Sequence, residues 1–169
     1  MLRITLITVG KLKEKYFIEA SREYEKRLST YCKLTVKELE QAALPSSPTA
    51  SEINIGLRRE AENIEKAIPN RAVIIPLCIE GKLLDSEELS RKIDSIALSG
   101  EGDICFIIGG SYGISDSIKQ KAALKLSMSP MTFPHRLARI MLLEQLYRAF
   151  KISEGSAYHK KHFIKDYTL

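Results

Sequence analysis

Short apolar runs rich in β-branched residues alternate along this chain with longer segments in which apolar residues recur at helical spacing. The strand-like runs occupy residues 2–9, 34–39, 72–79 and 103–108. The helix-like segments between them occupy residues 16–28, 52–68 and 86–99. Because neighbouring parallel strands need a crossover connection, this alternation predicts an α/β fold with a mostly parallel sheet flanked by helices. Ligands of such sheets bind at the carboxyl ends of the strands.

Two residues set boundaries of the predicted elements. Pro76 lies inside the third strand, where its missing N–H would remove a donor from the ladder, so we place the last regular strand residue near Ile75. Ser86 is suited to cap the helix that follows. The buried face of that helix is predicted to comprise Leu89, Ile93, Ile96 and Ala97.

Length and charge limit the classes of protein to consider. The chain has 169 residues, with 26 Lys and Arg against 21 Asp and Glu and a formal net charge of +5. This predicts one domain over residues 1–169 and permits a polyanionic partner without requiring one. No apolar run reaches the roughly 18–20 residues that span a bilayer, and no cleavable leader is recognisable before the first strand. We therefore expect a soluble, unprocessed cytoplasmic protein with no membrane partner.

The three cysteines argue against two further classes. Cys32, Cys78 and Cys105 are far apart in apolar surroundings, and none belongs to a CxxC or Cys/His cluster. The pattern predicts neither a disulfide framework nor a metal site.

The turn after the fourth strand reads Gly-Gly-Ser-Tyr-Gly over residues 109–113. As GxSxG, it has the form of the nucleophile elbow of serine hydrolases, with Ser111 as nucleophile. The partners that the later chain offers are His135, His159, His162, Asp116, Glu144, Glu154 and Asp166. A triad would need its acid and histidine on loops after further strands, whereas the remaining chain offers one short strand and one long helix. The glycines can instead form a plain tight turn or cradle a ligand, and the GxGxxG and Walker motifs are both absent.

The last third of the chain is predicted to contain a short strand at 123–127, a loop with two prolines at 128–134 and a long helix at 135–152. Four adjacent apolar residues at 140–143 cover every face of that helix, so it is either buried all round or shared with a second subunit. A homodimer is the economical interpretation. Glu144 and Arg148 lie four residues apart, so they can form a simple ion pair or serve the function directly.

Cations and histidines concentrate at the carboxyl terminus. From Pro134 onward the chain carries seven Lys and Arg against three acidic residues, together with all three histidines. The segment is either a solvated tail or a basic patch in which Tyr158 and His159 contact an RNA base while cations hold the backbone.

Four segments occur in a characteristic order along the chain. They are IGGSYG at 108–113, LSMSPMTFPH at 126–135, LEQLYRAFKI at 143–152 and YHK at 158–160. Together they resemble the bacterial RlmH family of SPOUT-class methyltransferases, and residues 9–16 and 24–28 are similar too. The resemblance implies a homodimer with a C-terminal trefoil knot in its α/β fold. It also implies methylation of N3 of a pseudouridine in 23S ribosomal RNA, with S-adenosylmethionine as cofactor and the assembled ribosome as substrate.

The same resemblance assigns roles to individual residues. The cofactor site is implied at Leu77, Gly109, Met128, Ser129, Pro130, Met131, Thr132 and Phe133. Catalytic roles fall on Tyr158, His159 and Arg148, and RNA contacts fall on Lys26, Arg27 and Lys160. The chain departs from the family pattern at Pro76 and in the short extension at 161–169. A basic RNA-binding protein without enzymatic activity stays the alternative.

Overall fold

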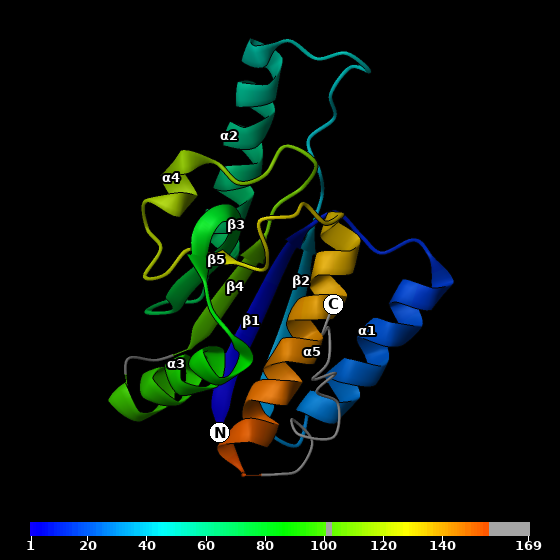
Figure 1. Ribbon diagram of the computed structural model, residues 1–169. Coiled ribbons are helices and arrows are strands. Elements are labelled where there is room, and N and C mark those ends of the chain that lie inside the picture. The colour runs from blue at the N-terminus through cyan, green and yellow to red at the C-terminus, as the bar shows by residue number, and fades with distance from the viewer. Residues whose placement is uncertain (101–102, 156–169) are drawn as a thin grey trace, which may run out of the picture.

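The computed structural model describes residues 1–100 and 103–155, which are built around a five-stranded sheet (Figure 1). The strands are β1 (Leu2–Val9), β2 (Cys32–Leu39), β3 (Val73–Leu83), β4 (Ile104–Ile108) and β5 (Leu126–Ser127). The helices are α1 (Lys15–Leu28), α2 (Ala50–Ala67), α3 (Ser86–Ser99), α4 (Asp116–Lys119) and α5 (His135–Ser153). The spatial order of the strands is β2-β1-β4-β3-β5, and every neighbouring pair is parallel. The predicted α/β class with a parallel sheet is confirmed.

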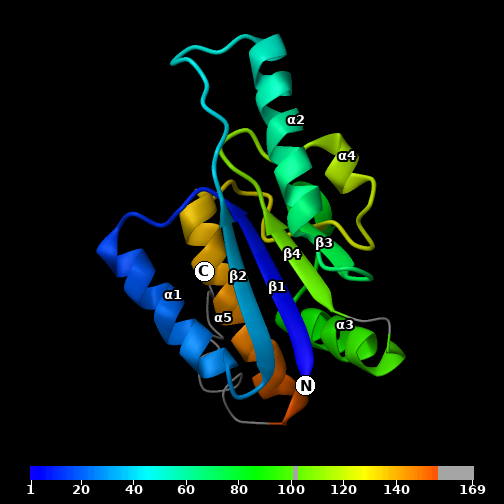
Figure 2. The same cartoon turned by 180° about the vertical axis from the view of Figure 1, so that it is seen from behind.

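Helices cover both faces of the sheet (Figures 1 and 2). α1, α3 and α5 pack on one face, where Ile4, Leu6 and Phe106 are fully buried. α2 and α4 pack on the opposite face, over Ile7 and Ile107. All five residues of β4 are buried, as predicted for a strand that is covered on both sides.

β3 is longer than predicted and continues past Pro76. Residues 73–76 pair with β4, and the strand then pairs with β5 across an irregular stretch. The carbonyl of Ile74 accepts a hydrogen bond from the N–H of Ala123, on the side of the strand that faces away from β4. Because backbone polar groups alternate in direction along a strand, the nitrogen of Pro76 points to that same side, and the ladder with β4 loses no donor. The predicted strand end near Ile75 is therefore wrong.

The cap of α3 also differs from the prediction, since the N-cap is Asp85 rather than Ser86. The Asp85 carboxylate accepts from the backbone N–H of Glu88 at 2.7 Å, and the Glu88 carboxylate accepts from the N–H of Asp85 at 2.8 Å. This reciprocal capping box satisfies two backbone donors at the start of the helix. Ser86 is the first helical residue, and its hydroxyl donates to Oε1 of Gln145 on α5 at 2.6 Å.

The buried face of α3 departs from the predicted one at two positions. Leu89, Ile93 and Ile96 are buried as predicted, whereas Ala97 is exposed. Ser90 is buried instead, because its hydroxyl donates to the carbonyl of Ala149 on α5 at 2.7 Å. A small polar residue thus sits where two helices approach closely.

The carboxyl-terminal elements follow the predicted order. β5 is only two residues long, shorter than the predicted strand at 123–127. α5 begins at His135 as predicted and ends one residue later than predicted. Within it Leu142 and Leu143 are buried, but Ile140 and Met141 are only half-buried, so the helix is not covered on every side by its own chain.

The cysteines, the character of the helices and the chain topology complete the description of the fold. Cys32, Cys78 and Cys105 are buried free thiols. Across residues 1–100 and 103–155, no helix combines the length and the apolar character needed to cross a bilayer. The trefoil knot stays a prediction.

Candidate active site

A pocket of about 600 Å³ opens at the carboxyl ends of the central strands. We call it the strand-end pocket. Its lining comprises residues 77–79, 108–111, 113, 127–129, 131–135 and 138. Three stretches distant in the sequence therefore meet there: the middle of β3, the turn after β4, and the loop that leads from β5 into α5.

Most of the residues predicted to bind a cofactor line this pocket. They are Leu77, Gly109, Met128, Ser129, Met131, Thr132 and Phe133. Pro130 belongs to the same loop but is exposed and does not line the pocket. Met131 lies at the rim, since it is 70% exposed. The structure thus brings together side chains and turns that the sequence could only place on separate elements.

The turn after β4 needs glycine for steric reasons. A Cβ atom at Gly109 would lie 2.3 Å from the carbonyl oxygen of Gly113, closer than two non-bonded atoms can approach. Gly113 has φ +82°, in the left-handed region that favours glycine, and its N–H donates to the carbonyl of Gly110 at 3.1 Å. The turn therefore stays tight, with its backbone forming one wall of the pocket.

Hydroxyl groups shape the loop that forms the opposite wall. Ser127 Oγ donates to the carbonyl of Ser129 at 3.1 Å, and Ser129 Oγ accepts from the N–H of Met131 at 3.0 Å. These local bonds bend the chain as it leaves β5, as hydroxyl side chains do when they bond to nearby backbone.

The described lining of the strand-end pocket contains no Asp, Glu, Lys or Arg. Its titratable groups are the side chains of Cys78 and His135. Burial raises the pKa of the Cys78 thiol. Burial, with the nearby Arg136 guanidinium, lowers the pKa of His135. Both groups are therefore neutral at pH 7, and so is the pocket.

Ser111 has a partner that does not suit a nucleophile. Its hydroxyl accepts a hydrogen bond from Nε2 of Gln41 at 3.0 Å. A carboxamide N–H donates and cannot take up the hydroxyl proton, so this contact does not activate Ser111 for attack. The geometry gives no support to the hydrolase alternative.

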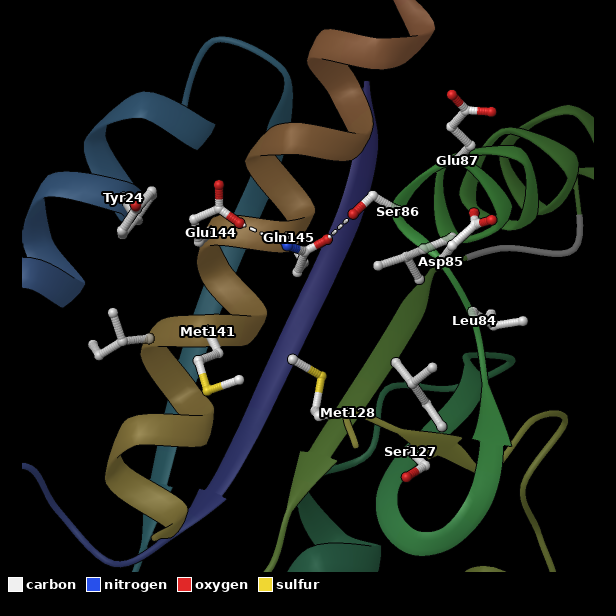
Figure 3. A pocket seen from close by; sticks show the side chains of 13 residues that line it. Tyr24, Leu84, Asp85, Ser86, Glu87, Ser127, Met128, Met141, Glu144 and Gln145 are labelled. Atoms are coloured by element: carbon white, nitrogen blue, oxygen red, sulfur yellow. Dashed lines mark hydrogen bonds between the residues drawn. The ribbon is translucent and has the colours of Figure 1, made fainter. Parts of the chain in front are cut away.

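A second pocket of about 740 Å³ lies between α1, α3 and α5 (Figure 3). We call it the helix-side pocket; its lining comprises Tyr24, residues 84–87, Leu89, residues 126–128, Ile140, Met141, Glu144 and Gln145. Figure 3 shows Met128 and Met141 extending into it from opposite walls. Because Ser127 and Met128 line both pockets, one short stretch of chain separates them.

A hydrogen-bonded chain runs along the α5 wall of the helix-side pocket (Figure 3). Ser86 donates to Gln145, whose Nε2 donates to Glu144 at 2.8 Å. Glu144 in turn binds Nη2 of Arg148 at 2.5 Å, with side chains only 19% and 14% exposed. The ion pair expected from the spacing of Glu144 and Arg148 is confirmed, and it is largely shielded from water.

Tyr24 of α1 also lines the helix-side pocket, and its ionisation depends on burial. Burial, with the negative charge of Glu144, raises the pKa of Tyr24. The Tyr24 phenol therefore stays protonated at neutral pH and offers a hydrogen-bond donor to the pocket.

The predicted RNA-contact residues of α1 lie near its carboxyl end. Arg27 pairs with Glu23 at 2.8 Å, and its guanidinium lies over the rings of Tyr24 and Tyr147 at 5.6 and 5.7 Å. Lys26 is exposed beside it. Tyr158, His159 and Lys160 lie outside the described residues, so the structure does not place them relative to either pocket.

Several residues of these sites were not singled out from the sequence for these roles. Ser86 and Gln145 join α3 to α5, and His135 lines the strand-end pocket. The sequence signal that could have pointed to His135 and Gln145 is their position in the LSMSPMTFPH and LEQLYRAFKI segments. Within the described part of the chain, no three His, Cys, Asp or Glu side chains are grouped to hold a metal ion.

Comparison with known sequences identifies the family. The family model described as predicted SPOUT methyltransferase matches residues 2–159. Ribosomal RNA large subunit methyltransferase H of Leuconostoc mesenteroides is 51% identical over 159 residues, 94% of this chain and 100% of that protein. The protein of the same name from Clostridium acetobutylicum is 47% identical over the same shares.

Solved structures resemble the fold at low sequence identity. A probable methylase family protein from Haemophilus influenzae matches with a TM-score of 0.50 and 16% identity, covering 93% of this chain and 69% of that one. The tRNA (m1G37) methyltransferase of Aquifex aeolicus matches with a TM-score of 0.50 and 14% identity, covering 87% and 69%. The family model and the sequence relatives both span nearly all of the chain, and the chain therefore belongs to the SPOUT methyltransferase family.

Proposed function

We propose that this protein transfers the methyl group of S-adenosylmethionine to N3 of a pseudouridine in 23S ribosomal RNA. The observation that carries the proposal is the strand-end pocket. Three stretches to which the resemblance assigns the cofactor converge there, although they are far apart in the sequence. Membership of the SPOUT family supports the same activity, and so do the names of the two relatives, whose full lengths match this chain.

The residues of the strand-end pocket fit an adenosyl group attached to a sulfonium. The volume of about 600 Å³ lies in the range of small-molecule sites. Leu77 and Phe133 are half-buried and offer apolar surface to a purine ring. The turn at Gly109 lets main chain come close to a ligand. The neutral lining has no cation to repel a positively charged sulfur.

When bound, S-adenosylmethionine supplies an electrophilic methyl group that an acceptor nitrogen attacks in line. N3 of neutral pseudouridine carries a proton, so the protein has to accept that proton or stabilise the resulting anion. We assign this task to His159 and Tyr158. Arg148 is assigned to the developing negative charge or to an adjacent phosphate.

The surroundings of Arg148 suit such a role. Glu144 holds one side of the guanidinium, and Gln145 and Ser86 hold Glu144 in turn. A guanidinium keeps its positive charge and presents its N–H groups in a fixed plane, so Arg148, held in orientation by Glu144, suits a phosphate or a developing negative charge. The network therefore positions Arg148 before substrate arrives, which lowers the entropic cost of binding.

We further propose that the enzyme acts as a homodimer on the assembled ribosome in the cytoplasm, with Lys160, Lys26 and Arg27 contacting RNA. Ile140 and Met141 leave apolar surface of α5 half-buried beside the helix-side pocket. A second copy packed there would cover this surface.

The proposal is tested by following radiolabelled methyl transfer from S-adenosylmethionine into large ribosomal subunits and whole ribosomes of a strain that lacks this enzyme. We expect methylation by the wild type, and a loss of about 100-fold in Arg148→Ala and in His159→Ala. Arg91→Ala, which changes an exposed arginine of α3, serves as the matched control and should keep full activity. No methylation by the folded wild type would contradict the function. Full activity in both variants would contradict the assigned roles.

A pair of glycine variants separates this enzyme from an RNA-binding protein without cofactor. In Gly109→Ala the new methyl collides with backbone, so calorimetry should register at least tenfold weaker binding of S-adenosylmethionine. Gly100→Ala, at the end of α3, has φ +68° and so loses some stability, but no atom lies within 4 Å of its Cβ and the variant should bind S-adenosylmethionine normally. An RNA-binding module would show no heat with this ligand in any of the proteins.

A further inference from the structure

The stretch from the end of β1 to the first residue of α1 carries three lysines within five residues: Lys11, Lys13 and Lys15. We call residues 10–15 the lysine loop. All three lysines are exposed. Lys15 approaches Glu19 only loosely, at 3.8 Å, with its side chain 90% exposed. Neither Lys11 nor Lys13 forms an ion pair with any residue that the structure describes.

The main chain of the lysine loop is held at both ends. At its start, Gly10 has φ +96° and donates its N–H to the carbonyl of Leu39 at 2.8 Å. At its end, Glu14 is the N-cap residue of α1, and its carboxylate pairs with Arg136 of α5 rather than with the helix backbone, with both side chains about 70% buried. The acid of the loop is therefore already neutralised, and the lysine charges stand on a fixed backbone.

The lysine loop adjoins the strand-end pocket. A Cβ atom at Gly10 would lie 3.5 Å from Nε2 of His135, and His135 lines that pocket. Figure 1 shows the loop leaving the carboxyl end of β1 and passing the start of α5. The free cations thus lie on the same edge of the sheet as the pocket.

The RNA-contact residues expected on α1 lie at the other end of that helix from the lysine loop. Lys26 and Arg27 are in the last turn of α1, a helix of 14 residues that spans about 20 Å. Arg27 also already pairs with Glu23. On α1 and the loop before it, the exposed cations nearest the strand-end pocket are therefore those of the lysine loop.

We propose that Lys11 and Lys13 bind the phosphate backbone of the RNA strand whose target base enters the strand-end pocket; this rests on the proposed function. An ammonium group on a flexible stem contacts a phosphate as a point charge and needs no particular base sequence. Tyr16 follows directly, 65% exposed and with its ring 4.6 Å from that of Phe17. It adds a flat surface of the kind on which unpaired RNA bases stack.

A single-stranded RNA segment suits this surface better than an acidic protein or a membrane. Such a segment presents phosphates and unstacked bases together, and the surface presents cations and an aromatic ring together. The lysine loop contains one half-buried apolar residue, Leu12, and so offers little apolar surface to a bilayer.

The test compares two double variants. Lys11→Gln/Lys13→Gln removes the two charges, and Lys33→Gln/Lys66→Gln removes two exposed charges elsewhere, one near the start of β2 and one in the last turn of α2. Binding of the large ribosomal subunits is measured by filter binding over a salt series, and methyl transfer is measured on the same particles. All four side chains are exposed, so both proteins should fold like the wild type, which circular dichroism checks.

The slope of log affinity against log salt is negative. We expect it to be shallower in the lysine-loop variant than in the wild type by about 1.4 to 1.8, the value for two phosphate contacts. Its KM for the particles should rise about tenfold at low salt, whereas kcat and the affinity for S-adenosylmethionine stay at wild-type values. The control variant should match the wild type in all of these.

A salt slope equal to that of the control would overturn the proposal. A fall in kcat with unchanged particle binding would also overturn it, because the lysines would then act on the chemistry. Failure of the wild type to methylate would count against the proposed function alone, since filter binding still measures the lysine contacts.

Discussion

His135 is the residue of the strand-end pocket whose charge depends most on its surroundings. Burial, with the neighbouring Arg136, lowers its pKa from the ordinary value of 6.5, and Glu14 opposes this only in part. Above pH 6.5 the imidazole is neutral in the folded and the unfolded chain alike. As the pH falls further, the unfolded chain takes up the proton first, so the stability that the neutral His135 contributes is lost as the pH passes through its folded pKa.

We therefore expect the free energy of unfolding to fall more steeply from pH 7 to pH 5 in the wild type than in His135→Gln. Urea unfolding at a series of pH values measures the difference. His159 and His162 are present in both proteins, so their contributions cancel in the comparison. Equal acid sensitivity of the two proteins would show that His135 is not the group responsible.

Arg148 and Ser111 illustrate how far single residues could be interpreted from the sequence. The spacing of Glu144 and Arg148 predicted an ion pair, which is confirmed, but spacing could not tell that the pair is shielded and joined to Ser86 through Gln145. The GxSxG pattern suggested a nucleophile at Ser111. Only the fold shows that its partner is an amide donor from the loop after β2.

At the scale of elements, the order of strands and helices was predictable. The strands appear as short, nearly continuous apolar runs, whereas the helices repeat apolar residues every three or four positions. Two of the boundaries that differed from the prediction did so for reasons that lie outside the local sequence. The end of β3 depended on which side of the strand Pro76 turns toward, and that depends on which neighbour lies there. The cap of α3 depended on whether Asp85 or Ser86 adopts extended backbone, and either residue type can cap a helix.

The capping box of α3 makes an element-scale prediction. Asp85→Ala should lower the free energy of unfolding by about 1 kcal/mol, because the N–H of Glu88 loses its acceptor. Asp85→Asn keeps a side-chain acceptor and should retain most of that stability. Urea unfolding of both variants measures the difference. An equal loss in the two would mean that the charge of Asp85, rather than its hydrogen bond, stabilises the helix.

At the scale of the whole molecule, the two pockets arise from the way α5 packs back across the sheet. The sequence predicted that ligands bind at the strand ends, and the resemblance assigned residues there; the strand-end pocket contains most of them. The helix-side pocket was not predictable, because it forms between α1, α3 and α5, and no local pattern fixes their contacts. The shared wall at Ser127 and Met128 means that a ligand in one pocket contacts residues of the other.

The central claim is that the strand-end pocket, and not its neighbour, holds the adenosyl group. A crystal structure of the protein with S-adenosylhomocysteine, the demethylated product, tests this most directly. We expect density for the ligand between Leu77, Gly109 and Phe133, with the sulfur toward the open side of the pocket. Density between Tyr24, Met141 and Glu144 in the helix-side pocket, with the strand-end pocket empty, would contradict the account.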